Sequence, residues 1–300
     1  MIEANETFNG TWPFTPHFTE APGFKMHYVD EGAGEPILCL HGEPTWGYLY
    51  RNFIPPLAKN YRVVVPDHMG FGKSETPQDK IYTLKTHVEN LFTVLDELAL
   101  EDITLVIQDW GGLIGGAAIA TQPDRFKRVF VMNTAVYPFC DISPHFDALM
   151  DSDWFRFIRG EGNMEAVLGN LRYTALSVLK MVGFQNTAAA TDDWVNAYSA
   201  PFGTLAECKG AIEFPTEVID VRFPYLDPPS EELVAKLRAK PAMLAVGMQD
   251  RAIPPYITVD AFKQAFGERP IVELANAGHF CQEDEPQALV ALIDHLMQLH

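Results

Sequence analysis

Two hydrophobic patterns alternate along the first half of the chain. Short runs of apolar and β-branched residues are typical of buried strands. Between them lie longer stretches, such as Thr83–Leu98, in which apolar residues recur every three or four positions, which predicts amphipathic helices. The strands expected from this pattern are Pro36–Leu40, Tyr61–Val65, Ile103–Gln108 and Arg128–Asn133.

The same alternation returns near the C-terminus. Strands are expected at Ala242–Val246 and Ile271–Leu274, with a helix near Thr258–Phe266 and a final helix from about Pro286. Alternating strands and helices specify a mostly parallel sheet that is covered by helices on both faces.

Between Tyr137 and Phe223 the alternation stops. This stretch contains no convincing strand, and it has the pattern of short helices interrupted by Gly160, Gly162, Gly169, Gly183 and Pro201. A helical insertion between two strands of the sheet explains it best. We therefore expect an α/β core formed by residues 1–136 and 225–300, carrying a helical cap formed by residues 137–224.

Length and charge narrow the class of protein. The 300 residues are 47% hydrophobic, which is enough for a large core, and no apolar run reaches the 18 residues of a membrane span. With 22 Lys and Arg against 40 Asp and Glu, the net charge is −18. Because such a surface repels phosphate backbones and anionic lipids, nucleic acid and membrane are not expected as partners. Nothing demands more than a monomer.

The cysteines and the N-terminus say little about special chemistry. Cys39, Cys140, Cys208 and Cys281 are far apart and form no C-x-x-C motif, so neither a disulfide scaffold nor a zinc cluster is expected. The first residues, MIEANETFNGTWPF, contain neither a cationic stretch nor an apolar segment of the kind found in signal peptides. A cytoplasmic location is the default expectation.

Chemically active residues are expected at the carboxyl ends of the strands, where open α/β sheets bind their ligands. Four segments at such positions contain candidates: HGEPTW at 41–46, DWGG at 109–112, GMQD at 247–250 and AGHF at 277–280.

Asp109 follows a predicted strand and precedes a helix rich in Gly and Ala. A strand that turns sharply into a helix, with glycine two residues later, is the pattern of a nucleophile elbow, in which serine is the usual residue. The alternative is an ordinary helix N-cap, because Asp is a favoured capping residue.

Asp250 and His279 complete a set in the chain order nucleophile, acid, base that is expected for α/β-hydrolases. Taken singly, His279 could be a structural histidine and Asp250 could cap the helix after its strand. Three such residues, in this order and all at carboxyl ends of strands, favour a catalytic triad.

Several motifs together resemble the haloalkane dehalogenases of the α/β-hydrolase superfamily over nearly the whole chain. They are HGEPTW, PDHMGFGKS at 66–74, IQDWGG at 107–112, GMQD and AGHF. The resemblance is greatest to the branch whose catalytic acid follows the strand after the cap. Asp250, the non-acidic Thr134 after the preceding strand, and Glu43 in place of Asn support this branch. Ile107 departs from the pattern, which usually has a small residue there.

The resemblance implies a role for each member of the triad. A carboxylate such as Asp109 can displace halide from a saturated carbon and leave an alkyl ester on itself. His279 would deprotonate the water that attacks this ester, and Asp250 would orient and stabilise the imidazolium. The backbone N–H groups of Glu43 and Trp110 are the expected oxyanion-hole donors.

The departing halide needs hydrogen-bond donors. The indole N–H of Trp110 is suitable because it donates and never accepts. The resemblance implies a second tryptophan from the cap, for which Trp154 is the best candidate, although Trp154 could also simply pack the cap on the core. Trp194 is expected to be mainly structural. Aromatic candidates for the lining of a small apolar pocket are Phe155, Phe157, Phe202 and Phe280.

No cofactor and no metal are expected. His41-Gly42-Glu43 resembles the H-x-E of zinc deaminases, but the P-C-x-x-C partner motif is missing. No G-x-G-x-x-G motif supports a nicotinamide cofactor. The expected partners are a small halogenated alkane, water and the halide product.

Two other functions compete with dehalogenation. Epoxide hydrolases use the same triad, with an acid that protonates the departing alkoxide, and in that family two cap tyrosines supply it. Tyr173 and Tyr198 could fill this role here. The other alternative is a non-catalytic receptor that keeps the hydrolase fold, because fold alone does not determine function.

Overall fold

The computed structural model describes residues 2–299, and its centre is one sheet in the order β1-β2-β4-β3-β5-β6-β7-β8. Strands β1 and β2 are antiparallel to their neighbours, and the other neighbouring strands are parallel. The strands are β1 (His17–Ala21), β2 (Phe24–Gly32), β3 (Pro36–Leu40), β4 (Arg62–Pro66), β5 (Ile103–Gln108), β6 (Phe126–Met132), β7 (Ala242–Gly247) and β8 (Ile271–Leu274).

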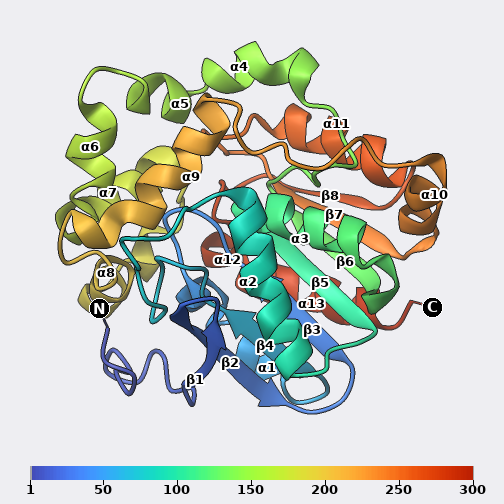
Figure 1. Cartoon of the computed structure of the whole chain (residues 1–300), viewed down its shortest axis with the longest axis horizontal. Coiled ribbons are helices and arrows are strands. Elements are labelled where there is room, and N and C mark those ends of the chain that lie inside the picture. Colours follow the sequence, from blue (N-terminus) through green and yellow to red (C-terminus); the bar gives the residue numbers. More distant parts are fainter. Residues whose placement is uncertain (1, 300) are drawn as a thin grey trace.

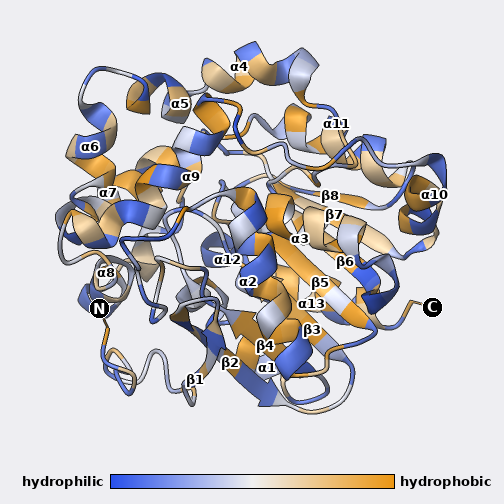
Figure 2. Ribbon diagram, viewed as in Figure 1, coloured by the Kyte–Doolittle hydropathy of each residue, from blue (hydrophilic) through white to orange (hydrophobic). Residues whose placement is uncertain are grey.

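Strands β3 to β8 lie within two residues of the six predicted strands. Every residue of β5 and β7 is buried, as expected for parallel strands that are covered on both faces. Figure 2 accordingly shows mostly hydrophobic residues along the centre of the sheet.

Strands β1 and β2 form a hairpin that the sequence analysis did not predict. Polar residues interrupt the apolar run by which β2 could have been recognised in the sequence. One of them is His27, which is fully buried and whose Nδ1 lies 2.8 Å from Asp67 Oδ2. The turn Pro22-Gly23, with Gly23 at φ 81°, was the available signal for a hairpin.

Helices pack on both faces of the sheet (Figure 1). Helices α2 and α3 contact each other on one face, and α1 and α13 contact each other on the other. The core helices are α1 (Ile54–Leu57), α2 (Leu84–Glu97), α3 (Trp110–Thr121), α10 (Glu231–Ala239), α11 (Pro255–Phe266), α12 (Cys281–Asp284) and α13 (Pro286–Met297). Short 3₁₀ helices are η1 (Gly47–Tyr50), η2 (Pro123–Arg125), η3 (Ser143–His145), η4 (Thr187–Ala189) and η5 (Ala206–Cys208).

Between β6 and β7 the chain leaves the sheet and forms a run of helices. In Figure 1 they lie at the top and left of the molecule. They are α4 (Phe146–Met150), α5 (Asp153–Ile158), α6 (Asn163–Leu168), α7 (Leu171–Val182), α8 (Asp192–Ser199) and α9 (Lys209–Ile219). This arrangement is what a cap requires, and the boundaries after residues 136 and 224 stay a proposal. Within residues 2–299, no helix has the length and apolar character needed to cross a membrane.

Candidate active site

Asp109 occupies a strained turn between β5 and α3. Its φ of 49° and ψ of −127° are values that a residue with a side chain rarely adopts. The Asp109 side chain makes no capping hydrogen bond to α3, whereas Thr83 caps α2 by accepting from the Thr86 N–H. The N-cap alternative therefore does not explain this residue. The turn instead directs the Asp109 carboxylate away from the axis of α3.

Glycines make room for this turn. A Cβ on Gly42 would lie 2.0 Å from Asp109 Oδ1, and one on Gly111 would lie 2.3 Å from the Leu40 carbonyl oxygen. The bulky Ile107 is accommodated by Gly115, where a Cβ would lie 2.9 Å from Ile107 Cγ2. The missing side chain of Gly115, about one turn into α3, thus leaves the space that the larger Ile107 needs.

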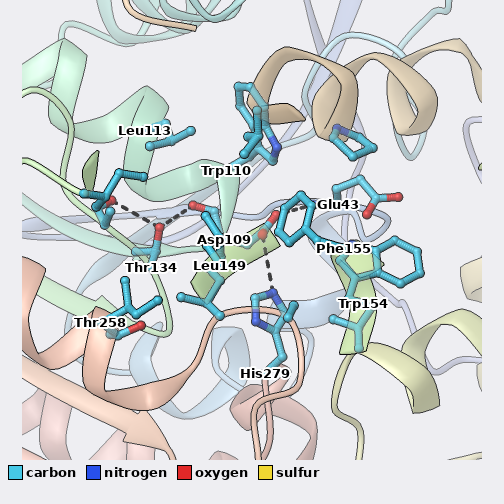
Figure 3. A pocket seen from close by; sticks show the side chains of 18 of the residues that line it. Glu43, Asp109, Trp110, Leu113, Thr134, Leu149, Trp154, Phe155, Thr258 and His279 are labelled. Atoms are coloured by element: carbon cyan, nitrogen blue, oxygen red, sulfur yellow. Dashed lines mark hydrogen bonds and ion pairs between the residues drawn. The ribbon is translucent and has the colours of Figure 1, made fainter. Parts of the chain in front are cut away.

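The three candidate triad residues come together, and Figure 3 shows two of them, Asp109 and His279, facing each other. His279 Nδ1 lies 2.8 Å from Asp250 Oδ2, within hydrogen-bond distance. His279 Nε2 faces Asp109 Oδ2 at 3.4 Å, which is long for a hydrogen bond but close enough for a strong charge interaction. The imidazole therefore stands between the two carboxylates.

Asp250 is held by four donors. Its Oδ1 accepts from the N–H groups of Ala252 (2.8 Å) and Ile253 (2.9 Å). Its Oδ2 accepts from Asn133 Nδ2 (2.8 Å) as well as facing His279. Asn133, at φ 36° directly after β6, was missed by the sequence analysis. Its position at a strand's carboxyl end was the signal that could have identified it.

Two opposing effects set the protonation of His279. Burial lowers its pKa, but the charges and hydrogen-bonding groups of Asp250 and Asp109 outweigh burial and raise the pKa to about 10. At neutral pH the resting site therefore holds an imidazolium between two carboxylates.

This raised pKa makes the stability of the protein depend on pH. The stabilisation is fully present below the unfolded-state pKa of about 6.5 and is lost as the pH rises toward the folded-state pKa of about 10. We expect the difference in unfolding free energy between wild type and His279→Gln to shrink over this range. Urea unfolding of both proteins across the range measures it, and a constant difference would contradict the raised pKa.

One backbone donor and one side-chain donor bind Asp109. The Glu43 N–H donates to Asp109 Oδ1 at 2.7 Å, and Thr134 Oγ1 donates to the Asp109 carbonyl at 2.5 Å. The Trp110 N–H makes no hydrogen bond to the carboxylate among the described residues. The oxyanion-hole assignment of Glu43 and Trp110 stays a prediction.

The side chain of Glu43 is a second acidic group beside Asp109. It is 5% exposed, and its Oε1 has no hydrogen-bond partner among the described residues. Burial, together with the nearby charge of Asp109, raises the pKa of Glu43 well above its usual range. These surroundings favour the neutral, protonated form of the Glu43 carboxyl group.

A small apolar cavity opens over these groups. It encloses about 80 Å³ of space for the centres of water-sized molecules. Glu43, Asp109 and His279 line it, and no Lys or Arg of the described chain does. Its apolar lining includes Leu113, Leu149, Trp154, Phe155, Val218 and Ile257.

Trp110 and Trp154 both line the cavity, from α3 and α5 (Figure 3). Trp110 stacks on Phe214 of α9, with 4.2 Å between ring centroids. The indole N–H of Trp46 donates to the Ala197 carbonyl, but neither lining tryptophan has a protein acceptor within residues 2–299. Their N–H groups are available to a ligand.

Of the four phenylalanines expected to line the pocket, Phe155 does so and the other three do not. Phe157, two positions further along α5, points elsewhere because residues two apart do not share a helix face. Phe202 packs against Phe71 with ring centroids 6.2 Å apart. Phe280 packs edge-on against the His279 ring and borders a separate small cavity.

Trp194 lies outside the cavity that contains Asp109. It stacks on Phe184 at 4.9 Å and packs edge-on against Tyr198 at 4.6 Å. Its packing fits the structural role expected for it. In the described part of the chain, no group of three His, Cys, Asp or Glu side chains could hold a metal ion.

The loop after α7 joins the cap to the His279 loop. Asp284 accepts from the N–H groups of Gln185 (2.9 Å) and Asn186 (2.7 Å) on the cap side, and from Gly278 (2.8 Å) on the core side. A Cβ on Gly183, at φ 143°, would lie 2.7 Å from the His279 backbone nitrogen. The cap therefore contacts the loop that contains His279 directly. No local sequence motif predicts this contact.

Known proteins resemble this chain over most of its length. The profile of the alpha/beta hydrolase fold family matches residues 35–286. Haloalkane dehalogenase 2 of Mycobacterium tuberculosis is 32% identical over 94% of each chain. A cis-3-alkyl-4-alkyloxetan-2-one decarboxylase of Shewanella oneidensis is 30% identical over 95% of this chain and 89% of its own.

Solved structures agree on the fold. The haloalkane dehalogenase DatA from Agrobacterium tumefaciens superposes with a TM-score of 0.74 at 23% identity, covering 95% of this chain and 96% of that one. The matched residues include strands β3 to β8, the helices between β6 and β7, and the turn at Asp109. The chain therefore belongs to the alpha/beta hydrolase fold family, and within it resembles the haloalkane dehalogenases over nearly its whole length.

Proposed function

We propose that this protein is a haloalkane dehalogenase, which hydrolyses small halogenated alkanes to an alcohol, halide and a proton. One observation carries the proposal. The carboxylate of Asp109 shares a small apolar cavity with the indole groups of Trp110 and Trp154, whose N–H groups have no protein acceptor among the described residues. A nucleophile and two halide donors in one cavity match displacement at a saturated carbon.

The first chemical step is displacement. A carboxylate oxygen of Asp109 attacks the carbon that bears the halogen, and the carbon–halogen bond breaks as the ester bond forms. The departing halide accepts hydrogen bonds from Trp110 and Trp154. Because indole N–H groups cannot take up a proton, they bind the anion without competing for one.

The second step is hydrolysis of the ester. Esterification removes the charge of Asp109, so the pKa of His279 falls from its raised value and the imidazolium loses its proton. Neutral His279 then deprotonates the water that attacks the ester carbonyl, while Asp250 stabilises the returning imidazolium. The Glu43 N–H, already directed at Asp109 Oδ1, supports the tetrahedral oxyanion.

The donors that line the cavity favour dehalogenation over the reaction of the Shewanella relative. The name of that relative describes a four-membered ring substituted with two alkyl groups. The indole groups of Trp110 and Trp154 in the lining favour a substrate that releases a halide ion.

The positions of the two cap tyrosines argue against the conventional epoxide hydrolase arrangement. Tyr173 is 82% exposed, and the Tyr198 hydroxyl donates to Glu283 Oε1 at 2.5 Å. Neither residue lines the cavity that contains Asp109.

Halide and proton release from 1,2-dibromoethane tests the proposed function, with Asp109→Ala in parallel. Release by wild type but not by the variant supports both dehalogenation and the nucleophile. An absence of release by wild type over a panel of short bromoalkanes would overturn the proposal, and release by Asp109→Ala would overturn the assignment of the nucleophile.

Trp154→Phe should bind bromide roughly 10–100-fold more weakly, because a hydrogen bond to a charged group contributes about 1.5–3 kcal/mol. It should also slow carbon–halogen cleavage while sparing the fold. Calorimetric titration with bromide measures the change in affinity. Trp194→Phe is the control, because Trp194 lies in the same cap but outside the cavity. An equal loss of bromide affinity in both variants would show that Trp154 is not the second halide donor.

Gly183→Ala should lower turnover by about 10²-fold, the typical effect of a 1 Å displacement of a reacting group. Its Cβ would force the backbone of His279 to shift. Gly162→Ala is the matched control, because Gly162 also has a positive φ but a Cβ placed there would have no neighbouring atom within 4 Å. Steady-state bromide release measures both variants. Equal activity in the two would show that the cap loop does not position His279.

A further inference from the structure

We propose that the carboxyl group of Glu43 is a proton donor inside the cavity, and that the same site therefore also opens small aliphatic epoxides to diols. This activity goes beyond the proposed dehalogenation. It rests on that proposal in one respect, because it uses Asp109 as nucleophile and His279 as base.

Glu43 is fixed beside the nucleophile. Its own N–H donates to Asp109 Oδ1 at 2.7 Å, and its side chain lines the cavity that Asp109 and His279 also line. Figure 3 shows its carboxyl group on the side of the cavity where Trp154 and Phe155 lie. A substrate that reaches Asp109 is therefore close to Glu43.

The carboxyl group is free to donate. Glu43 Oε1 is buried without a hydrogen-bond partner among the described residues, and no Lys or Arg of the described chain lines the cavity to keep the group ionised. Burial and the charge of Asp109 outweigh the opposite effect of the His279 charge and raise the pKa of Glu43 well above the usual range, which favours its protonated form. Dehalogenation does not use this proton, because halide leaves without one.

Epoxide opening needs such a proton. When a carboxylate attacks an epoxide carbon, the leaving group is an alkoxide that remains attached to the neighbouring carbon, and it is far more basic than halide. The two tyrosines that could have protonated it lie outside the cavity. Of the groups that do line it, Glu43 is the carboxyl group whose burial beside Asp109 favours the protonated form.

The proton balance closes over one cycle. Asp109 attacks a ring carbon, the carbon–oxygen bond breaks, and the alkoxide takes the proton of Glu43. The His279 imidazolium returns a proton to the Glu43 carboxylate and becomes the neutral base. His279 then takes a proton from water, and the hydroxide releases the diol from the Asp109 ester. The net reaction is epoxide plus water to diol, with no proton released to solvent.

The cavity also limits which epoxides fit. Its small volume and apolar lining favour short terminal epoxides without charged groups. We therefore choose 1,2-epoxybutane as the probe and 1-bromobutane, which has the same carbon skeleton, as the dehalogenation reference.

The experiment compares diol formation with bromide release in wild type and Glu43→Gln. Wild type is expected to form the diol. In Glu43→Gln the ratio of diol formation to bromide release should fall about 10²-fold, the lower end of the contribution of general acid catalysis. Tyr173→Phe and Tyr198→Phe are the controls and should keep the wild-type ratio. A Glu43→Asp variant, which restores an acid, should recover part of the lost ratio.

Each negative result of this experiment has a different consequence. Bromide release without diol formation by wild type would overturn this inference and leave the proposed function standing, whereas no bromide release would overturn the proposed function itself. An unchanged ratio in Glu43→Gln would assign the proton to another group, such as His279, and overturn the role of Glu43. If steady-state bromide release is too slow to measure, the masses of the Asp109 adducts formed in a His279→Gln background give the same ratio for the opening step alone.

Discussion

A His279→Gln variant will release one bromide per active site and then stop, with the alkyl group retained on Asp109. Displacement needs the Asp109 carboxylate and the two indole donors, none of which this change removes. Hydrolysis needs a base, and the His279 Nε2 that faces Asp109 at 3.4 Å is the group placed to activate water. The intermediate should therefore accumulate instead of turning over.

Intact-protein mass spectrometry after incubation with 1-bromobutane measures this result. The variant should gain the mass of one butyl group, and peptide mapping should find it on Asp109. His145→Gln is the matched control, because His145 also pairs with a carboxylate, Asp260 at 2.9 Å, but on the surface and outside the cavity. Full steady-state turnover by His279→Gln would overturn the assignment of the base.

The positions of Asp109 and Asp250 were predictable from the sequence because each follows a strand with a strong hydrophobic pattern. Strands β5 and β7 are buried on both faces, so their apolar runs could be recognised and the following turns located. Glycines next to Asp109 marked the close approach of backbone that the structure shows. Local pattern and local geometry coincide at these positions.

The supporting residues were not predictable, because their partners are distant in the sequence. Asn133 reaches Asp250 across 117 positions, and Asp284 binds the cap loop at Gln185 across 99. Such contacts depend on how distant segments of the chain pack together in the folded protein. The same holds for the pocket, in which Phe155 contributes to the lining and Phe280 does not.

Glu43 shows a different limit. The sequence indicated its backbone N–H as a donor, but the protonation of its side chain depends on burial next to Asp109, which only the folded chain provides. The role proposed for Glu43, as the acid for ring opening in a dehalogenation site, follows from packing rather than from a motif.

An Asp250→Asn variant should lose about 10⁴-fold in turnover while keeping its fold, the loss known for the equivalent change in a serine-protease triad. The hydrogen bonds around Asp250 determine how the new amide must lie. The N–H groups of Ala252 and Ile253 both require an acceptor at the Oδ1 position, so the amide oxygen stays there. The amide nitrogen then faces His279 Nδ1 and makes it an acceptor, which puts the imidazole proton on Nε2.

In that tautomer His279 cannot take a proton from water, so the ester should persist much as in His279→Gln. The amide nitrogen would also face the Asn133 Nδ2 donor, so a modest loss of stability should accompany the loss of turnover. Bromide release, adduct mass and urea unfolding separate the two effects. Asp260→Asn breaks a carboxylate–histidine pair outside the cavity and should leave turnover unchanged. Turnover by Asp250→Asn within about tenfold of wild type would mean that the tautomer of His279 does not depend on Asp250, because a loss near 10⁴-fold is the magnitude expected for a fixed wrong tautomer.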